Sequence, residues 1–457
     1  MASSQYCRAG PVIFTLVPLN MNSLEALEDF RNRRFCERPG QETLPDEIYI
    51  TFNPHRPEGI YPSTIGRAGD IRLPRTFPAS IQCAFEIHKD TGEVMLVDKS
   101  PDQSCYVRYS TNTDEILDFT DFGAMVICPH AHEIILHFGE GESDSWMLWA
   151  INWWHMPGPV DMEAWAAQVG FHARIGQNMT LQSIPPTRRL DFDGANRENR
   201  YLPRDNIKRK PGTIVTKGID ALTGHLVAIK TVKDRKPGRY RLEGEAIKEL
   251  STDLNHSHVM EFLQVEIKTD HFELVMELQD GNVYELARNE KFADARNLFQ
   301  FGDNVGRPLM HQMLQALDYL CWKDITHRDV KPSNILYRRI DKHTYHYRLT
   351  DFGMATTAPH PRRGDGDSMF MPPEVLYLDG DHTTKIDIWS LCVSFCCIFG
   401  FKLTLSDKFE VYDKHGRVHP DWIPVLETMV VVDSNNRVSA GDVLTEMFEG
   451  VGRVTAE

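Results

Sequence analysis

The chain has little positive charge for its size. It carries 50 Lys and Arg against 65 Asp and Glu, which gives a net charge of −15 at pH 7. Nucleic-acid binding relies on clustered cationic side chains at the phosphates, so we expect no direct nucleic-acid partner. The deficit is uneven, because residues 197–241 contain thirteen Lys or Arg and four Asp or Glu. That segment is either a solvated basic face or a surface that attracts phosphate groups.

Long apolar runs and patterned cysteines are also missing. The longest apolar run, residues 391–401, is much shorter than the roughly 20 residues of a membrane-spanning helix, so we expect a buried helix and no membrane partner. The nine cysteines show no CxxC spacing, which indicates reduced thiols. The first residues show no secretory signal pattern, and we expect a soluble, non-secreted protein of the cytoplasm, the nucleus or both.

Length and composition predict two globular domains joined by a linker. The 457 residues include 41% hydrophobic ones, enough to bury a core, and single cores stop growing at about 250–300 residues. We predict a first domain at 12–155, a linker at 156–205 and a second domain at 206–450. The linker segment is polar and has no periodicity.

The first domain has the pattern of a β-sandwich. Short apolar or alternating runs are separated by turn residues, a spacing typical of packed antiparallel sheets. These runs lie at 48–52, 84–88, 93–98, 124–128 and 133–138. A charged insertion at 23–47 predicts a helix that Ser23 caps, between the first two strands.

The second domain begins with strand patterns and continues with long helical patterns. A strand pair ends at 225–232, and helical periodicity follows at 308–322 and 384–399. This order predicts a two-lobed α+β domain with a small β-rich lobe and a larger helical lobe.

Candidate chemistry concentrates in two motifs of the second domain. Residues 327–334 read His-Arg-Asp-Val-Lys-Pro-Ser-Asn, and residues 351–353 read Asp-Phe-Gly. Transfer of a γ-phosphoryl group needs a carboxylate that orients and deprotonates the attacking hydroxyl, a role that fits Asp329. It also needs hard oxygen ligands that hold magnesium against the phosphates, roles that fit Asn334 and Asp351.

This ordered set of motifs resembles the serine/threonine protein kinases over residues 206–450. The Val-Ala-Ile-Lys motif at 227–230 matches the strand whose lysine, here Lys230, holds the α- and β-phosphates of ATP. The resemblance implies ATP and Mg²⁺ as cofactors, protein substrates, and a catalytic group of Asp329, Lys331 and Lys230. Lys331 lies two residues after the base, as in the serine/threonine-specific members.

In this family the ATP-binding lysine has an acidic partner. A glutamate on the helix that follows the lysine strand fills this role. The segment 241–254 predicts that helix after Lys230 and offers Glu243, Glu245 and Glu249. We favour Glu245.

Further matches concern the adenine pocket and the scaffold around the catalytic loop. The triplet 275–277 resembles the entry to the hinge, where Glu277 and the backbone around Leu278 would lie against adenine. The resemblance gives structural rather than chemical roles to three other residues: His327, Asp387 and Arg437.

One family feature is missing. Kinases cover the ATP phosphates with a glycine-rich loop, because only a backbone without Cβ approaches the phosphates closely. Here Lys208, Lys210 and Thr213 stand where three glycines are expected, and Gly212 alone remains. Two alternatives follow: an active kinase whose loop lysines contact the phosphates, or a pseudokinase that serves as a phosphopeptide-binding scaffold.

The activation segment differs from the family pattern as well. Asp367 replaces the threonine that bonds the catalytic aspartate and lysine in the family. Thr356, Thr357 and Ser368 are either phosphorylation sites, whose phosphate would pair with Arg328, or plain exposed hydroxyls.

The first domain carries its own set of matches. Residues 65–67, 70–74 and 96–100, together with Ser80, resemble the FHA fold, a β-sandwich whose end loops bind phosphothreonine peptides. The resemblance implies that Arg67 and Ser80 bracket the phosphate by charge-assisted hydrogen bonds. An FHA domain before a kinase resembles the DNA-damage checkpoint kinases. That resemblance implies a phosphothreonine-bearing protein partner, a homodimer and checkpoint-type signalling.

The first domain also departs from the FHA pattern. Cys83 stands where the family has a histidine, residues 102–104 replace an Asn-Gly pair, and the Ser-Gln sites upstream are reduced to Ser4 and Gln5. The alternative interpretation is a sandwich that has lost its ligand and serves as a scaffold.

Overall fold

The computed structural model describes residues 12–36, 47–153, 200–290 and 305–456, with gaps inside the last three ranges. The linker that we predict at 156–205 lies mostly outside these residues.

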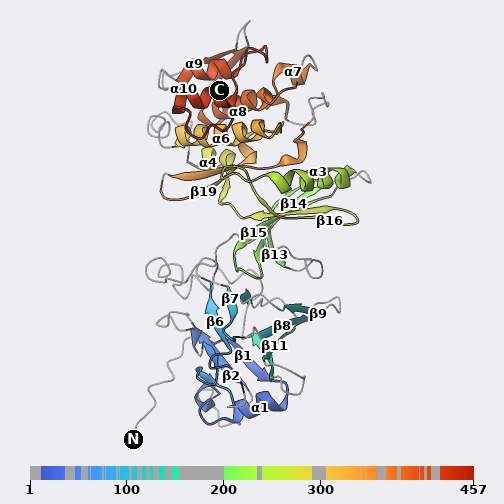
Figure 1. Ribbon diagram of the computed structural model, residues 1–457, viewed down its shortest axis with the longest axis vertical. Coiled ribbons are helices and arrows are strands. Elements are labelled where there is room, and N and C mark those ends of the chain that lie inside the picture. The colour runs from blue at the N-terminus through green and yellow to red at the C-terminus, as the bar shows by residue number, and fades with distance from the viewer. Residues whose placement is uncertain are drawn as a thin grey trace. The chain divides into compact units, whose positions relative to one another are not determined.

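The chain divides into two compact units, which Figure 1 shows with their elements labelled. Unit 1 consists of residues 1–206 and 217–227. Unit 2 consists of residues 207–216 and 228–457. The domain boundaries at 12–155, 156–205 and 206–450 remain predictions.

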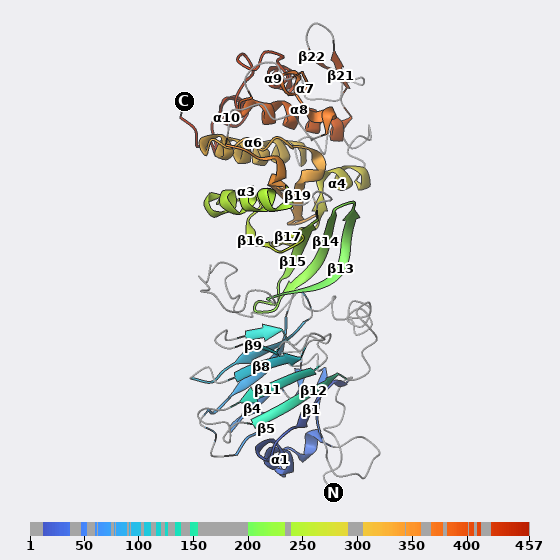
Figure 2. The same ribbon diagram turned by 90° about the vertical axis from the view of Figure 1, so that its right-hand side faces the viewer.

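Unit 1 contains a seven-stranded sheet in the order β3-β2-β1-β12-β11-β8-β9. Its strands are β1 Val12–Pro18, β2 Ile48–Phe52, β3 Ile60–Tyr61, β8 Cys105–Ser110, β9 Ile116–Phe119, β11 Glu133–Phe138 and β12 Met147–Trp153. In Figure 2, β9, β8, β11, β12 and β1 follow one another in this order.

A second sheet of unit 1 has the order β10-β7-β6-β4-β5. Its strands are β4 Thr64–Gly66, β5 Ile71–Arg72, β6 Cys83–Ile87, β7 Val94–Asp98 and β10 Ala124–Val126. Buried residues of both sheets share one core, and the rings of Phe14 and Phe85 meet edge to face at 5.1 Å. The five apolar runs predicted as strands are confirmed as β2, β6, β7, β10 and β11.

The insertion between β1 and β2 begins with helix α1, Met21–Glu28, and a single turn η1, Arg33–Phe35. The N-cap is Asn20, so our assignment of Ser23 was wrong by one turn. Ser23 is the third helical residue, and its hydroxyl accepts from the Asn20 backbone N–H while Asn20 Oδ1 accepts from the Ser23 N–H. This reciprocal pair satisfies two donors that a helix start leaves unpaired.

A five-stranded sheet and one helix precede the helical part of unit 2 in the chain. The strand order of the sheet is β13-β14-β15-β17-β16. The elements are β13 Tyr201–Lys210, β14 Thr213–Asp220, β15 Leu226–Val232, α3 Arg239–Asp253, β16 Phe262–Ile267 and β17 Phe272–Glu277.

The helical part of unit 2 follows. Its helices are α4 Val283–Asn289, α6 Arg307–Trp322, α7 Pro373–Leu376, α8 Lys385–Phe399, α9 Trp422–Met429 and α10 Ala440–Phe448. Its strands are β18 Gly281–Asn282, β19 Ile335–Arg339, β20 Tyr345–Leu349, β21 Lys402–Leu405 and β22 Phe409–Tyr412. The predicted helices are confirmed as α6 and α8. Within the described ranges, no helix is long and apolar enough to cross a membrane.

Strands β13 and β14 meet in a tight turn where a glycine-rich loop was expected. Only Pro211 and Gly212 lie between the two strands. Gly212 has φ +80°, the left-handed conformation that a Pro-Gly turn requires at its second central residue. Its carbonyl accepts from the Lys233 N–H at 2.7 Å, so the residue that follows β15 holds the turn in place. The connection between the strands is therefore a fixed two-residue turn and not a long loop.

We predict that Gly212→Ala destabilises unit 2 more than Gly450→Ala does. Both glycines have positive φ, 80° and 73°, so both substitutions incur left-handed strain of roughly 1–2 kcal/mol. A Cβ at Gly212 would also lie 2.7 Å from the Lys233 carbonyl oxygen, whereas nothing lies within 4 Å of one at Gly450. Differential scanning calorimetry should show the larger fall in Tm for Gly212→Ala. Equal falls would contradict the turn geometry.

Candidate active site

The catalytic loop places three of the predicted residues in direct contact. Lys331 Nζ donates to both carboxylate oxygens of Asp329, at 2.7 and 2.6 Å. Asn334 Nδ2 donates to Asp329 Oδ2 at 2.8 Å and to the Asp329 carbonyl at 2.9 Å. The single turn η4, Pro332–Asn334, follows Lys331 and returns the amide to the carboxylate. The carboxylate is therefore fixed from two sides.

The backbone of the same loop is anchored to helix α8. Asp387, which is 2% exposed, accepts from the backbone N–H groups of His327 at 2.7 Å and Arg328 at 2.8 Å. Arg328 has φ +67°, so this anchoring holds a non-glycine residue in the left-handed region just before Asp329. Burial raises the pKa of Asp387, and the electrostatic interaction with His327 and the two N–H donors act against that rise.

The His327 ring orders the loop from inside. Its Nδ1 accepts from the Asp329 N–H at 3.3 Å, so Nε2 carries the proton and donates to the Thr350 carbonyl at 3.0 Å. The ring is fully buried and meets Phe352 edge to face at 4.8 Å. These contacts agree with the structural role expected for this histidine.

The second motif presents its aspartate to the lysine of β15. Asp351 has φ +71°, and its Oδ1 accepts from Lys230 Nζ at 2.7 Å. Burial acts to raise the pKa of Asp351, but the charge and hydrogen bond of Lys230 outweigh it and the net shift is downward. The Thr350 N–H donates to the Asn334 carbonyl at 2.9 Å, which ties the two motifs together. Lys230, Asp351 and Asn334 therefore belong to one site.

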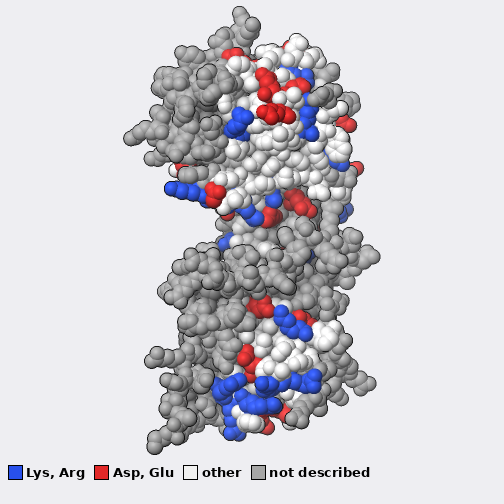
Figure 3. Space-filling view, turned by 60° about the vertical axis from the view of Figure 1, so that its left-hand side comes forward, with Lys and Arg blue, Asp and Glu red and all other residues white. Residues whose placement is uncertain are grey.

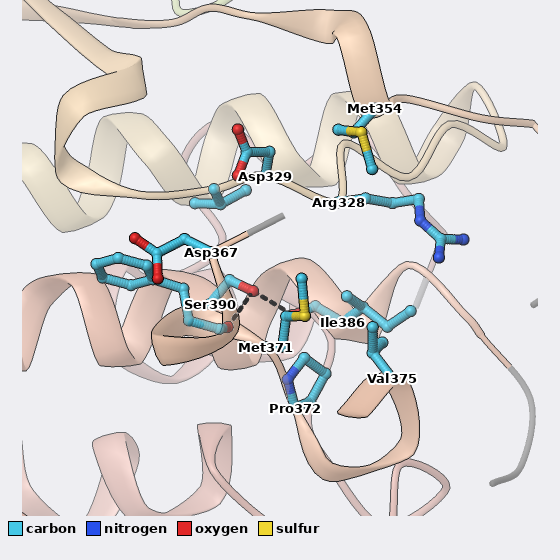
Figure 4. A pocket seen from close by; sticks show the side chains of 11 residues that line it. Arg328, Asp329, Met354, Asp367, Met371, Pro372, Val375, Ile386 and Ser390 are labelled. Carbon is cyan, nitrogen blue, oxygen red and sulfur yellow. Dashed lines mark hydrogen bonds between the residues drawn. The ribbon is translucent and has the colours of Figure 1, made fainter. Parts of the chain in front are cut away.

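A pocket opens beside Asp329, as Figure 4 shows. Its wall combines the catalytic loop with the segment that ends in α7, and most of the lining side chains are apolar. Asp367 lies in the same wall, and its Oδ1 accepts from the Met369 N–H at 3.2 Å as the cap of the turn η6, Ser368–Phe370. Ser390 on α8 donates to the Phe370 carbonyl at 2.8 Å and fixes the pocket floor.

A buried ion pair closes the segment below the pocket. Arg437 Nη1 and Nη2 donate to the two carboxylate oxygens of Glu374 at 2.7 and 3.0 Å. The Arg437 side chain has no exposed surface and that of Glu374 is 6% exposed. Such a bidentate pair fixes direction as well as distance. Arg437 therefore makes a structural contact, as expected for it.

In unit 1, two loops place Arg67 and Ser80 next to each other. The Ala68 N–H donates to the Ser80 carbonyl at 2.8 Å, and Arg67 Nε donates to the Ala79 carbonyl at 3.3 Å. A Cβ on Gly66 would lie 2.4 Å from the Ser80 carbonyl oxygen, so the two loops approach this closely only at a glycine. Both Arg67 and Ser80 are exposed.

A model of the protein kinase domain matches residues 212–448, more than half of the chain. The chain belongs to the protein kinase family. This kinase is 29% identical over 300 residues to serine/threonine-protein kinase 33 of Mus musculus, across 59% of this chain and 58% of that protein.

Other relatives match shorter stretches of the kinase. The ovarian-specific serine/threonine-protein kinase Lok of Drosophila melanogaster is 30% identical over 229 residues, across 46% of this chain and 45% of that protein. An Aurora kinase of Schizosaccharomyces pombe is 31% identical over 176 residues, across 37% of this chain and 46% of that protein. The chain spans about half the length of the curated relatives it matches.

The glutamate that approaches the kinase site is not the one we favoured. Glu245 faces solvent, with its side chain 53% exposed and paired to Arg241 at 3.2 Å. Glu243 is half-buried, and a Cβ on Gly353 would lie 2.8 Å from its Oε1. The orientation of α3 therefore brings Glu243 to the Asp-Phe-Gly turn. Because Lys230 pairs with Asp351, the structure does not bring Lys230 and Glu245 together.

Two arginines that sequence reasoning missed hold the hinge of the kinase. Arg338 Nη1 donates to Glu277 Oε1 at 2.6 Å, and Arg348 Nη1 bonds the other carboxylate oxygen. Arg338 Nη2 also donates to the Leu278 carbonyl at 3.0 Å. Burial acts to raise the pKa of Glu277, but these two guanidinium groups lower it overall. The side chain of Glu277 thus anchors the hinge, and its backbone is what remains for a nucleotide.

Only the strand register identifies this pair of arginines. In the β19–β20 hairpin Leu336 faces Arg348, and Arg338 lies two residues beyond Leu336. Alternate residues of a strand share a face, so both guanidinium groups lie on the side that meets Glu277. No sequence motif marks either position.

We predict that Glu243→Gln weakens nucleotide binding about tenfold, and that Glu245→Gln changes it less than twofold. Glu243 lies against the turn that carries Asp351, whereas Glu245 makes an exposed i,i+4 pair of small energetic value. Titration with a fluorescent ATP analogue and Mg²⁺ would measure both affinities. A larger loss for Glu245→Gln would restore the original assignment.

Proposed function

We propose that this chain is an ATP-dependent serine/threonine protein kinase that transfers the γ-phosphoryl group to hydroxyls of protein substrates. The observation that carries the proposal is the arrangement of Asp329, Lys331 and Asn334 beside the pocket of Figure 4. A carboxylate held by an ammonium and an amide is fixed in position before a substrate binds, and phosphoryl transfer depends mainly on positioning.

Asp329 is the proposed base. It accepts the proton of the attacking hydroxyl as the new oxygen–phosphorus bond forms. The bond between the γ-phosphorus and the bridging oxygen breaks, and ADP leaves with that oxygen. Lys331 donates to both Asp329 oxygens, so it holds the carboxylate in the position from which it can take the proton. The apolar wall of the pocket, which includes Met354 and Met371, would receive a substrate side chain next to the acceptor hydroxyl.

The donor set fits Mg²⁺ and ATP. The side-chain amide of Asn334 donates both hydrogen bonds to Asp329, so Asn334 Oδ1 is the atom left for a cation. Asp351 adds a carboxylate from the adjoining loop. Amide and carboxylate oxygens are the ligands that Mg²⁺ prefers beside phosphates. When bound, Mg²⁺ would neutralise charge that develops on the phosphates. Lys230 would turn from Asp351 to the α- and β-phosphates, and the backbone of Glu277 and Leu278 would receive adenine.

The hairpin at Gly212 favours direct contact between lysines and phosphates over a glycine cradle. Lys208 and Lys210 stand on the exposed end of β13, next to the turn. The rival proposal is a pseudokinase that retains the fold as a scaffold, and the lost glycines are the observation in its favour. ATP turnover distinguishes the two.

We further propose that unit 1 is an FHA-like phosphopeptide-binding module. Hydrogen bonds between the two loops place two exposed residues, Arg67 and Ser80, next to each other. These groups bracket a phosphate by charge-assisted hydrogen bonds. The homodimer, the checkpoint-type role and the placement in cytoplasm or nucleus rest on resemblance.

We predict that Asp329→Asn lowers the phosphorylation rate by roughly 100-fold to 10,000-fold, the usual contribution of a general base. Asparagine keeps the shape of the side chain but cannot accept the proton. Lys230→Met should lose most nucleotide affinity. Phosphate transfer from labelled ATP and Mg²⁺ to the protein itself and to a basic carrier protein measures both effects.

The control is the thermal unfolding of each variant, which should match the wild type within a few degrees. No labelled product from the wild type, together with no shift of its Tm by ATP and Mg²⁺, would replace the kinase proposal with the scaffold. Label that persists in Asp329→Asn would assign the transfer to a contaminant.

A further inference from the structure

Unit 1 has a basic face beside the two loops that carry Arg67 and Ser80. Figure 3 shows Lys and Arg side chains gathered in a band over this end of the unit. Arg33 and Arg34 of η1 are exposed there, and Arg72 of β5 is partly exposed. We call Arg33, Arg34 and Arg72 the arginine face. It is notable in a chain whose net charge is −15.

A buried asparagine fixes η1 against β5. Asn32 has no exposed surface, and its Nδ2 donates to the carbonyls of Ala26 at 2.7 Å and Arg72 at 2.8 Å. Its Oδ1 accepts from the Arg72 N–H at 2.7 Å. The side chain therefore completes the hydrogen bonds of a strand edge. Arg33 and Arg34, the next two residues, are held at a set position beside Arg72.

The arginine face is continuous with the phosphate-binding loops. Arg72 Nη1 donates to the Arg67 carbonyl at 2.7 Å. Arg67 in turn bonds the loop of Ser80 through the Ala79 carbonyl. A chain of hydrogen bonds thus runs from η1 through β5 to the loop that would bind a phosphothreonine.

One described acid, Asp29, acts on the arginine face through its electrostatic attraction to Arg72. Asp29 pairs with Arg31, whose Nε lies 2.9 and 3.0 Å from the two carboxylate oxygens. The hydrogen bond from Arg31 is the main cause that lowers the pKa of Asp29. Within the described part of the chain, Arg33 and Arg34 have no carboxylate partner. Arg34 instead stacks over the Phe35 ring at 4.6 Å, which orders its guanidinium group.

We infer that the arginine face binds a second phosphate on the peptide whose phosphothreonine meets Arg67 and Ser80. The ligand class is a doubly phosphorylated protein segment. Each phosphate carries nearly two negative charges and offers several acceptor oxygens, which matches planar guanidinium donors. The inference rests on the proposed phosphopeptide function of unit 1 and adds the partner's specificity.

The test compares two peptide pools on the full-length protein by fluorescence anisotropy. One pool carries a central phosphothreonine among randomised uncharged residues. The other adds a second phosphothreonine two to five residues away. The wild type should bind the doubly phosphorylated pool at least tenfold more tightly. The double variant Arg33→Gln with Arg34→Gln should bind both pools with the affinity that the wild type has for the singly phosphorylated pool. The variant Arg67→Gln should lose binding to both pools.

Arg31→Gln is the matched control. It lies in the same segment, but Asp29 already neutralises its charge, so the variant should keep the tenfold preference. All four proteins should unfold at the same temperature, because the substituted side chains are exposed.

Each other outcome overturns a definite part of the inference. Equal binding of both pools by the wild type removes the second phosphate site and leaves the phosphothreonine site in place. If the wild type binds neither pool, both the phosphothreonine site and the second phosphate site are contradicted. Binding to phosphatidylserine vesicles that depends on Arg33 and Arg34, without any gain from the second phosphate, would assign the face to a lipid surface.

Discussion

The carboxylate of Asp387 and its two backbone donors are the contact on which the catalytic site depends. A buried carboxylate without partners would be costly, and the N–H groups of His327 and Arg328 supply those partners. The same hydrogen bonds hold Arg328 in a left-handed conformation, which a non-glycine residue rarely adopts. That conformation turns Asp329 toward the pocket, where Lys331 and Asn334 complete its surroundings. The geometry of the loop is therefore set by a carboxylate on another element, helix α8.

The same principle, a charged side chain that fixes backbone, recurs across unit 2. Glu374 is held by Arg437, which positions the lower wall of the pocket. Glu277 is held by Arg338 and Arg348, which positions the hinge. In each case the cost of partial burial is offset by bidentate or paired guanidinium bonds. Each pair joins elements far apart in the sequence, so each holds one part of the site in place.

What the sequence could predict depended on how local the determinants are. Asp329, Lys331 and Asn334 lie within six residues, and the geometry of one short loop brings them together. The orientation of α3 is not local. Glu243 and Glu245 differ by about 200° around a helix, and the face that packs inward is chosen by contacts such as Gly244 against Phe272. The arginines on the hinge likewise depend on a strand register that no motif encodes.

The hairpin at Gly212 illustrates how two solutions to one problem differ physically. A glycine-rich loop binds phosphates with backbone N–H groups, whose directions are fixed and whose approach requires the absence of Cβ. A Pro-Gly turn preceded by Lys208 and Lys210 offers charge without direction, on long side chains of the strand β13. Attraction of this kind weakens with salt, because exposed charges are screened within about 10 Å at 0.1 M. In the proposed kinase, Lys230, Asn334 and Asp351 would then orient the phosphates, and contacts with their neighbours fix these three residues in place.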